Sequence, residues 1–149
     1  MKALTVLQPW AQLLILGAKK YEIRSWKTKH RGPLLIHAGR TFSEEARALC
    51  AVEPFRSALA RAGIKAASDL PRRVLLGSVT LEDCLPTDQV LYENADEREL
   101  AIGDFRPGNW AWRMTNPLQL PAPIPYKGVL GIFDVPDHIC SAPTSALLG

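Results

Sequence analysis

The chain has 149 residues, of which 47% are hydrophobic and 22% charged, and this composition is typical of one globular domain with a hydrophobic core. It excludes disorder as the main state of the chain, and no apolar run is long enough to span a bilayer. The three cysteines and three histidines lack zinc or disulfide spacing, so we expect no metal, no other cofactor and a cytoplasmic protein.

The net charge of +3 is unevenly distributed along the chain. Between residues 19 and 40, Glu22 is the single acid against seven basic residues, which are Lys19, Lys20, Arg24, Lys27, Lys29, Arg31 and Arg40. Such a cluster creates a positive surface field and indicates a phosphate or polyanion partner. A solvated lysine-rich loop would have the same charge pattern.

The first third of the chain predicts alternating strands and one helix. Residues 2–6 form a short apolar strand, and a helix over 8–17 begins at a proline and ends at Gly17. A strand over 20–26 follows, and the apolar run 34–36 has the composition of a buried strand.

A longer helical region follows, starting at Thr41 or Ser43 and interrupted at Pro54. Residues 85–108 read as an acidic insertion with one short helical turn. The remaining strands are expected at 74–81, 110–115 and 128–135. Several short strands with one early helix and an inserted helical arm predict an α+β fold built on a small mixed β-barrel.

The strand at 20–26 has an unusual face. Alternation places Lys20, Glu22, Arg24 and Trp26 on one side, and it turns Tyr21 and Ile23 toward the core. The charged face is either a solvated surface or the wall of a site.

Lys19, Glu22 and Arg24 are the candidate catalytic residues. Crowding by Lys20 and Arg24 would lower the pKa of Lys19, because like charges disfavour the charged form, and would prepare it as a general base. Glu22 would oppose this change by pairing with the lysine. A plain ion-paired strand edge explains the same three residues equally well.

The candidate nucleic-acid contacts surround this motif in sequence. Basic side chains suit phosphates, and Trp26 within a basic stretch can stack on a base. Alternatively, Trp26 covers the open end of the barrel. His37 is expected to be structural. The full set of expected contacts is Lys20, Trp26, Lys27, Lys29, His30 and Arg31.

Two ordered sets of motifs give the chain a family resemblance. The first comprises LQPWA, GAKKYEIR, SW and RGPL within residues 7–34, and the second comprises GD, WAW, NP, PIP and KG within residues 103–128. Together they resemble the ASCH domain family, whose motif G-x-K-x-x-E-x-R is matched at every fixed position. The resemblance extends over about residues 2–135.

This resemblance implies a PUA-like β-barrel in which the motif lines a cleft between barrel and helices. The family is associated with RNA binding, in settings such as RNA processing and transcription coactivation. Some members are enzymes: a bacterial branch hydrolyses N4-acetylcytidine, and nuclease activity is ascribed to others.

The sequence departs from the amidohydrolase branch at one position. In that branch a lysine activates a threonine three residues later, with a distant glutamate as acid or base. Lys19 matches the lysine, whereas Glu22 occupies the threonine position. A mechanism in which Glu22 activates water and Lys19 stabilises the oxyanion stays open, with Glu82 as a candidate for the distant acid.

Three functions follow as hypotheses. The favoured one is an RNA-binding protein with a basic cleft, for which RNA processing or ribonuclease activity stays open. The alternatives are an N4-acetylcytidine amidohydrolase and a protein-interaction adaptor in transcription or translation. We expect RNA or a nucleotide as partner, no membrane association, and either a monomer or a weak dimer. The whole chain, 1–149, is expected to be one domain, with a helical insertion at about 42–72 and a short tail after 136.

Overall fold

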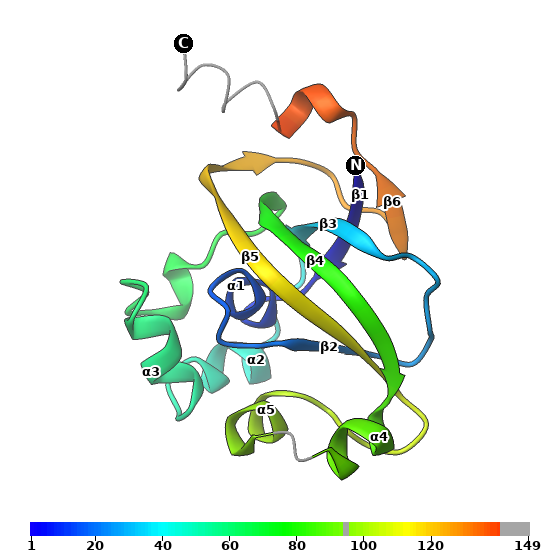
Figure 1. Ribbon diagram of the computed structural model, residues 1–149. Helices are drawn as coiled ribbons and strands as arrows, with labels where there is room; N and C mark the ends of the chain where they lie inside the picture. The colour runs from blue at the N-terminus through cyan, green and yellow to red at the C-terminus, as the bar shows by residue number, and fades with distance from the viewer. Residues whose placement is uncertain (94–95, 141–149) are drawn as a thin grey trace.

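A curled six-stranded sheet organises the computed structural model, which describes residues 1–93 and 96–140 (Figure 1). The strands, in chain order, are β1 (Lys2–Val6), β2 (Tyr21–Arg24), β3 (Gly32–Ala38), β4 (Val74–Pro86), β5 (Trp110–Pro125) and β6 (Ile132–Asp134). The helices are α1 (Trp10–Ile15), α2 (Glu44–Leu49), α3 (Phe55–Ala60), a 3-10 turn (Ala67–Asp69), α4 (Thr87–Tyr92) and α5 (Glu97–Ile102). The predicted α+β class is confirmed, and the predicted small mixed β-barrel is present as a half-barrel.

The strands are arranged in the order β2-β5-β4-β3-β1-β6. β1 and β3 are parallel, and all other neighbours are antiparallel. The sheet curls around α1, whose buried face meets side chains from four strands (Figure 1). The fold is therefore a half-barrel with one helix in its hollow.

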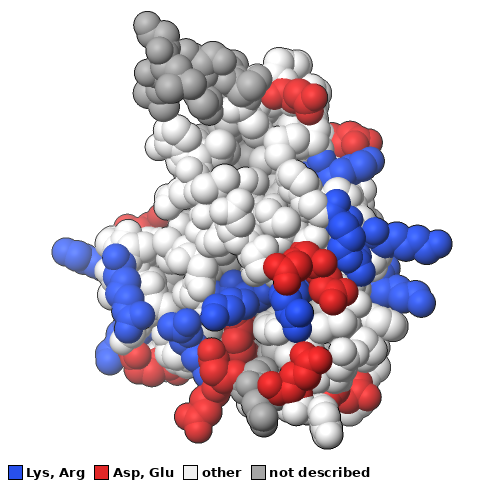
Figure 2. All heavy atoms as spheres, in the orientation of Figure 1, with Lys and Arg blue, Asp and Glu red and all other residues white. Residues whose placement is uncertain are grey.

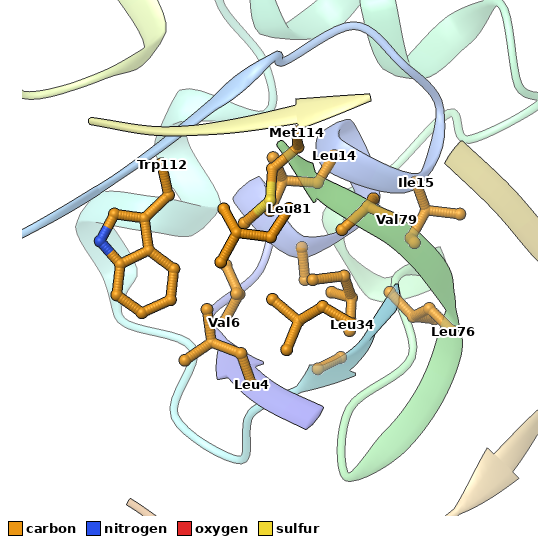
Figure 3. Packing of buried hydrophobic residues seen from close by; sticks show 13 residues of the cluster. Leu4, Val6, Leu14, Ile15, Leu34, Leu76, Val79, Leu81, Trp112 and Met114 are labelled. Carbon is orange, nitrogen blue, oxygen red and sulfur yellow. The ribbon is translucent and has the colours of Figure 1, made fainter. Parts of the chain in front are cut away.

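The main core lies between α1 and the concave face of the sheet. Figure 3 shows Leu14 and Ile15 of α1 among side chains from β1, β3, β4 and β5. Trp112 on β5 is the largest fully buried side chain and reaches the end of this cluster. Burying such a ring contributes several kcal/mol, typically about 3–5 kcal/mol as judged from truncation to alanine.

The predicted beginning of the fold is confirmed. β1, α1 and β3 occur where the apolar runs and the flanking proline and glycine residues predict them. Gly17 adopts a left-handed φ of 75° just beyond α1. There, the backbone N–H of Ala18 donates to the carbonyl of Leu13 at 3.0 Å and ends the helix in the manner of a Schellman turn. β2 is shorter than predicted and spans four residues.

The helical region after β3 consists of two short helices. Ser43, rather than Thr41, caps α2: its hydroxyl accepts a hydrogen bond from the backbone N–H of Ala46 at 3.0 Å. Pro54 precedes α3, as its inability to continue a helix requires. Both helices fall within the predicted insertion at about 42–72. Of the predicted tail after 136, residues 141–149 lie outside the described residues.

The two longest strands extend well beyond their predictions. β4 continues through Glu82 and Asp83, and β5 continues through a proline-rich outer arm to Pro125. The outer arm is largely exposed, and the pairing of β4 with β5 shifts register three times. Prolines, which have no backbone N–H to donate, are tolerated in a strand under these conditions.

The acidic insertion holds two helices, α4 and α5, rather than one turn. Across the described ranges, no helix is long and apolar enough to cross a membrane.

Candidate functional site

The structure contains a cleft of about 1170 Å³. Residues from β1, β2, β3, α5 and the segment after β5 contribute to its lining. Five basic residues line it, which are Lys19, Arg24, Arg40, Arg73 and Lys127. Two acidic residues, Glu22 and Asp104, line it as well. Apolar side chains such as Trp10, Ile102 and Leu130 contribute the other walls.

Lys19 lies in the turn after α1 and is 2% exposed, although it lines the cleft. Its backbone N–H donates to the carbonyl of Leu13 at 3.1 Å, so the end of the helix fixes its position. Burial lowers the pKa of the Lys19 ammonium below its ordinary 10.5, while the charges of Glu22 and Glu99 raise it. The predicted direction is confirmed. The cause is desolvation rather than the like charges of Lys20 and Arg24.

Glu22 and Arg24 form an ion pair on β2, with Arg24 Nε 2.9 Å from Glu22 Oε2. The same guanidinium donates through Nη2 to the carbonyl of Thr5 at 2.6 Å. Glu22 is buried and lines the cleft together with Arg24, which agrees with the wall-of-a-site interpretation of these two residues. Tyr21 and Ile23 are half-buried and pack against a small hydrophobic cluster. Of the predicted charged face, Glu22 and Arg24 line the cleft, whereas Lys20 and Trp26 do not.

Glu99 is a buried acid that sequence reasoning missed. It lies on α5 and is 3% exposed, and the backbone N–H of Lys20 donates to its Oε1. Its Oε2 has no hydrogen-bond partner among the residues that the structure describes. Burial raises the pKa of Glu99, and the nearby Lys19 charge lowers it. Glu82, the acid considered from sequence, is exposed and does not line the cleft.

His37 links the floor of the cleft to the segment after β5. Its Nε2 lies 2.6 Å from the carbonyl of Tyr126, which can only accept, so Nε2 carries the proton and Nδ1 accepts from the Thr5 hydroxyl at 3.1 Å. Burial lowers the pKa of His37, and the bond to Tyr126 raises it. A Cβ on Gly128 would lie 2.8 Å from the imidazole, so only glycine packs here without displacing the ring.

The six expected nucleic-acid contacts all lie outside the cleft lining. Trp26 packs edge-on against Trp112 with the ring centroids 4.7 Å apart, and its carbonyl accepts from the Trp112 indole at 3.2 Å. Lys27 lies over the ring of Trp110, and the Arg31 guanidinium is 3.5 Å from an Asp83 carboxylate oxygen. Trp26 therefore covers the end of the main core, although 38% of it is exposed.

Charged side chains also mark the surface beyond the cleft. Figure 2 shows basic groups gathered at the right-hand edge, where Figure 1 places the connection between β2 and β3, with acidic groups beside them. Lys27, Lys29 and Arg31 belong to this connection. The structure thus separates a cleft group, Lys19, Glu22 and Arg24, from a surface group that could meet a ligand only outside the cleft. Among the described residues, no three His, Cys, Asp or Glu side chains are placed to hold a metal ion.

Comparison of the sequence with known protein families identifies the family to which the chain belongs. The ASCH domain model matches residues 4–123, which is most of the chain. The protein belongs to the ASCH domain family. Activating signal cointegrator 1 from Homo sapiens is 32% identical over 125 residues, and the Mus musculus protein of the same name is 34% identical over 127 residues. Both alignments cover 84% of this chain, which spans about a fifth (20%) of the length of those relatives.

A solved ASCH structure supports the fold independently. The ASCH protein from Zymomonas mobilis aligns with a TM-score of 0.57 at 10% identity, over 98% of this chain and 94% of that chain. Identity at this level supports the shared architecture alone. The ASCH motif itself forms the turn after α1 and the edge strand β2, which together place Lys19, Glu22 and Arg24 at the cleft of this ASCH domain.

Replacing Glu99 by glutamine is expected to lower the pKa of Lys19 further. The substitution removes a negative charge that favours the ammonium, while glutamine keeps an oxygen for the Lys20 N–H. NMR titration of the lysine 13Cε resonances measures the change. Glu97→Gln, an exposed acid on the same helix, is the control and should leave the Lys19 pKa unaltered.

The same substitution has a defined effect on stability. Because the folded-state pKa of Glu99 is raised above its ordinary 4.5, the native ASCH domain binds more protons than the unfolded chain above that pH. The contribution of Glu99 to stability is therefore present below pH 4.5 and is lost as the pH rises through the folded-state pKa. Urea titrations should show wild type losing stability relative to Glu99→Gln over this window. A constant difference between the two would contradict a raised folded-state pKa of Glu99.

Proposed function

We propose that this ASCH domain binds single-stranded RNA in the cleft. The observation that carries the proposal is the charge of the cleft lining, which has five basic residues against two acids. Both acids already have arginine partners: Glu22 pairs with Arg24, and Asp104 pairs with Arg106 at 2.6 Å. A concave surface of one sign concentrates ligands of the opposite charge, and phosphodiesters are the anions that an RNA supplies.

The size and chemistry of the cleft also suit a nucleotide. A volume of about 1170 Å³ is ample for a nucleotide-sized ligand, and the apolar walls at Trp10, Ile102 and Leu130 are suited to a base. The resemblance to ASCH domains associated with RNA favours this ligand over other polyanions. In this proposal the cleft is the primary site, and the β2–β3 connection adds phosphate contacts at its outside.

A salt titration of RNA binding tests the proposal. Wild type should bind a short single-stranded RNA at low salt, with log Kd rising linearly with log salt concentration. Arg24→Gln removes a cleft cation and leaves Glu22 without its partner, so we expect at least about a tenfold loss of affinity. Fluorescence anisotropy measures both quantities, and Arg24→Lys, which keeps the charge, should recover part of the loss.

The control variant carries Lys27→Gln, Lys29→Gln and Arg31→Gln together. Loss of these three charges should reduce the salt slope while leaving substantial binding, because they lie outside the cleft. Binding abolished by this triple variant and unaffected by Arg24→Gln would place the RNA on the surface connection and overturn the cleft site. Failure of wild type to bind RNA at low salt would overturn the function itself.

A second candidate function is hydrolysis of RNA or of an N4-acetylcytidine nucleoside at Lys19. The observation that favours it is the lowered pKa of this buried lysine, which raises the fraction of neutral amine available as a base. Glu22 is less suited to that role than the sequence suggested, because its carboxylate is engaged by Arg24.

In deacetylation, neutral Lys19 would take a proton from a water whose oxygen attacks the acetyl carbonyl carbon. The resulting ammonium would return that proton to N4 as the C–N bond breaks, giving cytidine and acetic acid, which then releases its proton to solvent as acetate forms. The step uses water as its co-reactant and needs no threonine nucleophile, so Glu22 at that position is compatible with it.

A further inference from the structure

Three basic residues line the cleft in addition to Lys19 and Arg24 of the motif. Arg40 follows β3, Arg73 precedes β4, and Lys127 follows β5, so they come from segments far apart in sequence. All three are exposed at the cleft surface. Within residues 1–93 and 96–140, none of them has an ion-pair partner.

Backbone hydrogen bonds hold the three segments together. The N–H of Arg73 donates to the carbonyl of Ala38 at 2.7 Å, and the N–H of Tyr126 donates to the carbonyl of Arg73 at 3.0 Å. The Arg72 guanidinium donates to the carbonyl of Arg40 at 3.1 Å. Arg73 itself adopts a left-handed φ of 59°, which a residue with a side chain seldom takes unless its neighbours impose it. The backbone segments that carry Arg40, Arg73 and Lys127 are therefore held next to one another by hydrogen bonds.

This group is separate from the motif residues Lys19, Glu22 and Arg24, which line the same cleft. A chain of four hydrogen bonds lies between them: Arg24 donates to Glu22 and to the Thr5 carbonyl, the Thr5 hydroxyl bonds to His37, and His37 bonds to the Tyr126 carbonyl. Thr5 and His37 thus lie between the ion pair of the motif and the segment that carries Lys127. The two cleft acids belong to the other groups, since Glu22 binds Arg24 and Asp104 binds Arg106.

We propose that Arg40, Arg73 and Lys127 form a phosphate subsite, so that the cleft takes a phosphorylated nucleotide or a phosphodiester rather than a free nucleoside. Two guanidinium groups can each engage a phosphate through paired N–H donors, and the lysine adds a third charge. Three like charges on one cleft surface, without an ion-paired carboxylate among the described residues, create a positive field that attracts an anion. The proposal rests on the proposed function, because it names the ligand class of the same cleft.

The subsite predicts how the cleft discriminates among small ligands. Isothermal titration calorimetry at low salt would compare cytidine, cytidine 5′-monophosphate and cytidine 3′-monophosphate on the wild-type protein. At least one nucleotide should bind about tenfold or more tightly than cytidine, because it alone reaches the three cations. Inorganic phosphate should compete with that nucleotide and leave cytidine binding unchanged. The two monophosphates also separate a 5′ from a 3′ orientation of the bound base.

The decisive variant combines Arg40→Gln, Arg73→Gln and Lys127→Gln, which keeps the backbone hydrogen bonds that join the segments. It should bind nucleotide and cytidine with affinities within about twofold of each other, since the phosphate has lost its partners. The Lys27→Gln, Lys29→Gln, Arg31→Gln variant removes as many charges elsewhere and should retain the wild-type preference for nucleotide.

Equal affinity of wild type for cytidine and both nucleotides would overturn the subsite, as would a nucleotide preference that survives in the decisive variant. Displacement of cytidine by inorganic phosphate would also overturn it, because it would place both ligands in one pocket. These outcomes are separate from the proposed function. Wild type that binds RNA but prefers no nucleotide loses only the subsite, whereas wild type that prefers nucleotide but does not bind RNA loses only the RNA function.

Discussion

Gly77→Ala is expected to destabilise the protein by about 3 kcal/mol or more. A Cβ at this position would lie 2.1 Å from the carbonyl oxygen of Leu118 and 3.0 Å from the Cα of Gln119. Both are backbone atoms of β5, so no side-chain rotation can relieve the contact. The strands would have to separate at the point where their register shifts, next to buried core residues of β4.

Urea denaturation followed by circular dichroism measures this cost. Gly63→Ala is the matched control because it makes the same chemical change where a Cβ meets no atom within 4 Å. Gly63 has a φ of +79°, so its replacement should cost only the backbone strain of about 1 kcal/mol. Equal midpoints for the two variants would show that β4 and β5 do not approach as closely as described.

Lys19→Met is expected to reduce any hydrolytic turnover by about 100-fold or more, which is the contribution that a positioned proton-transfer group makes. Methionine matches the length of the lysine stem and suits a site that is 2% exposed, so the fold should persist. The pKa of Glu99 should rise further, because the positive charge that lowers it is lost. Turnover is measured with N4-acetylcytidine and with single-stranded RNA as separate substrates.

Lys20→Met is the control for this variant. Lys20 is the neighbouring lysine, is exposed and lies outside the cleft lining, so its loss should leave turnover close to that of wild type. Undiminished turnover in Lys19→Met would remove the lysine from the chemistry. No turnover of either substrate by wild type would show that the hydrolytic candidate is wrong and leave the binding function to stand by itself.

Local sequence signals predicted the parts of the fold where apolar runs are continuous. β1, α1 and β3 are of this kind. Gly17 predicts the end of the helix because glycine readily adopts the left-handed conformation that ends a helix. The outer arm of β5 was not predicted, because its proline content argues against a strand. Exposure and register shifts make the prolines tolerable there, and neither can be read from the sequence.

The site was predicted in part. The motif spacing singled out Lys19, Glu22 and Arg24, and all three line the cleft. Glu99 was missed because residues 85–108 read as an acidic insertion, in which one acid among several has no distinguishing signal. Its burial depends on a long-range contact, in which the backbone N–H of Lys20, just before β2, donates to its side chain. Asp96 and Glu99 have the spacing of a helix start, and this signal could have identified α5.

The sheet order has a consequence for the shape of the whole domain. β2 is one edge of the sheet, and β1 lies next to the opposite edge, so strand pairing never closes the barrel. The hydrogen bond from the Arg24 guanidinium on β2 to the Thr5 carbonyl on β1 bridges this open side of the sheet. In a closed barrel, backbone hydrogen bonds between paired strands would occupy this place. The guanidinium that links the two strands is also a cation of the cleft lining, so substitution of Arg24 removes a cleft charge and this hydrogen bond across the open side together.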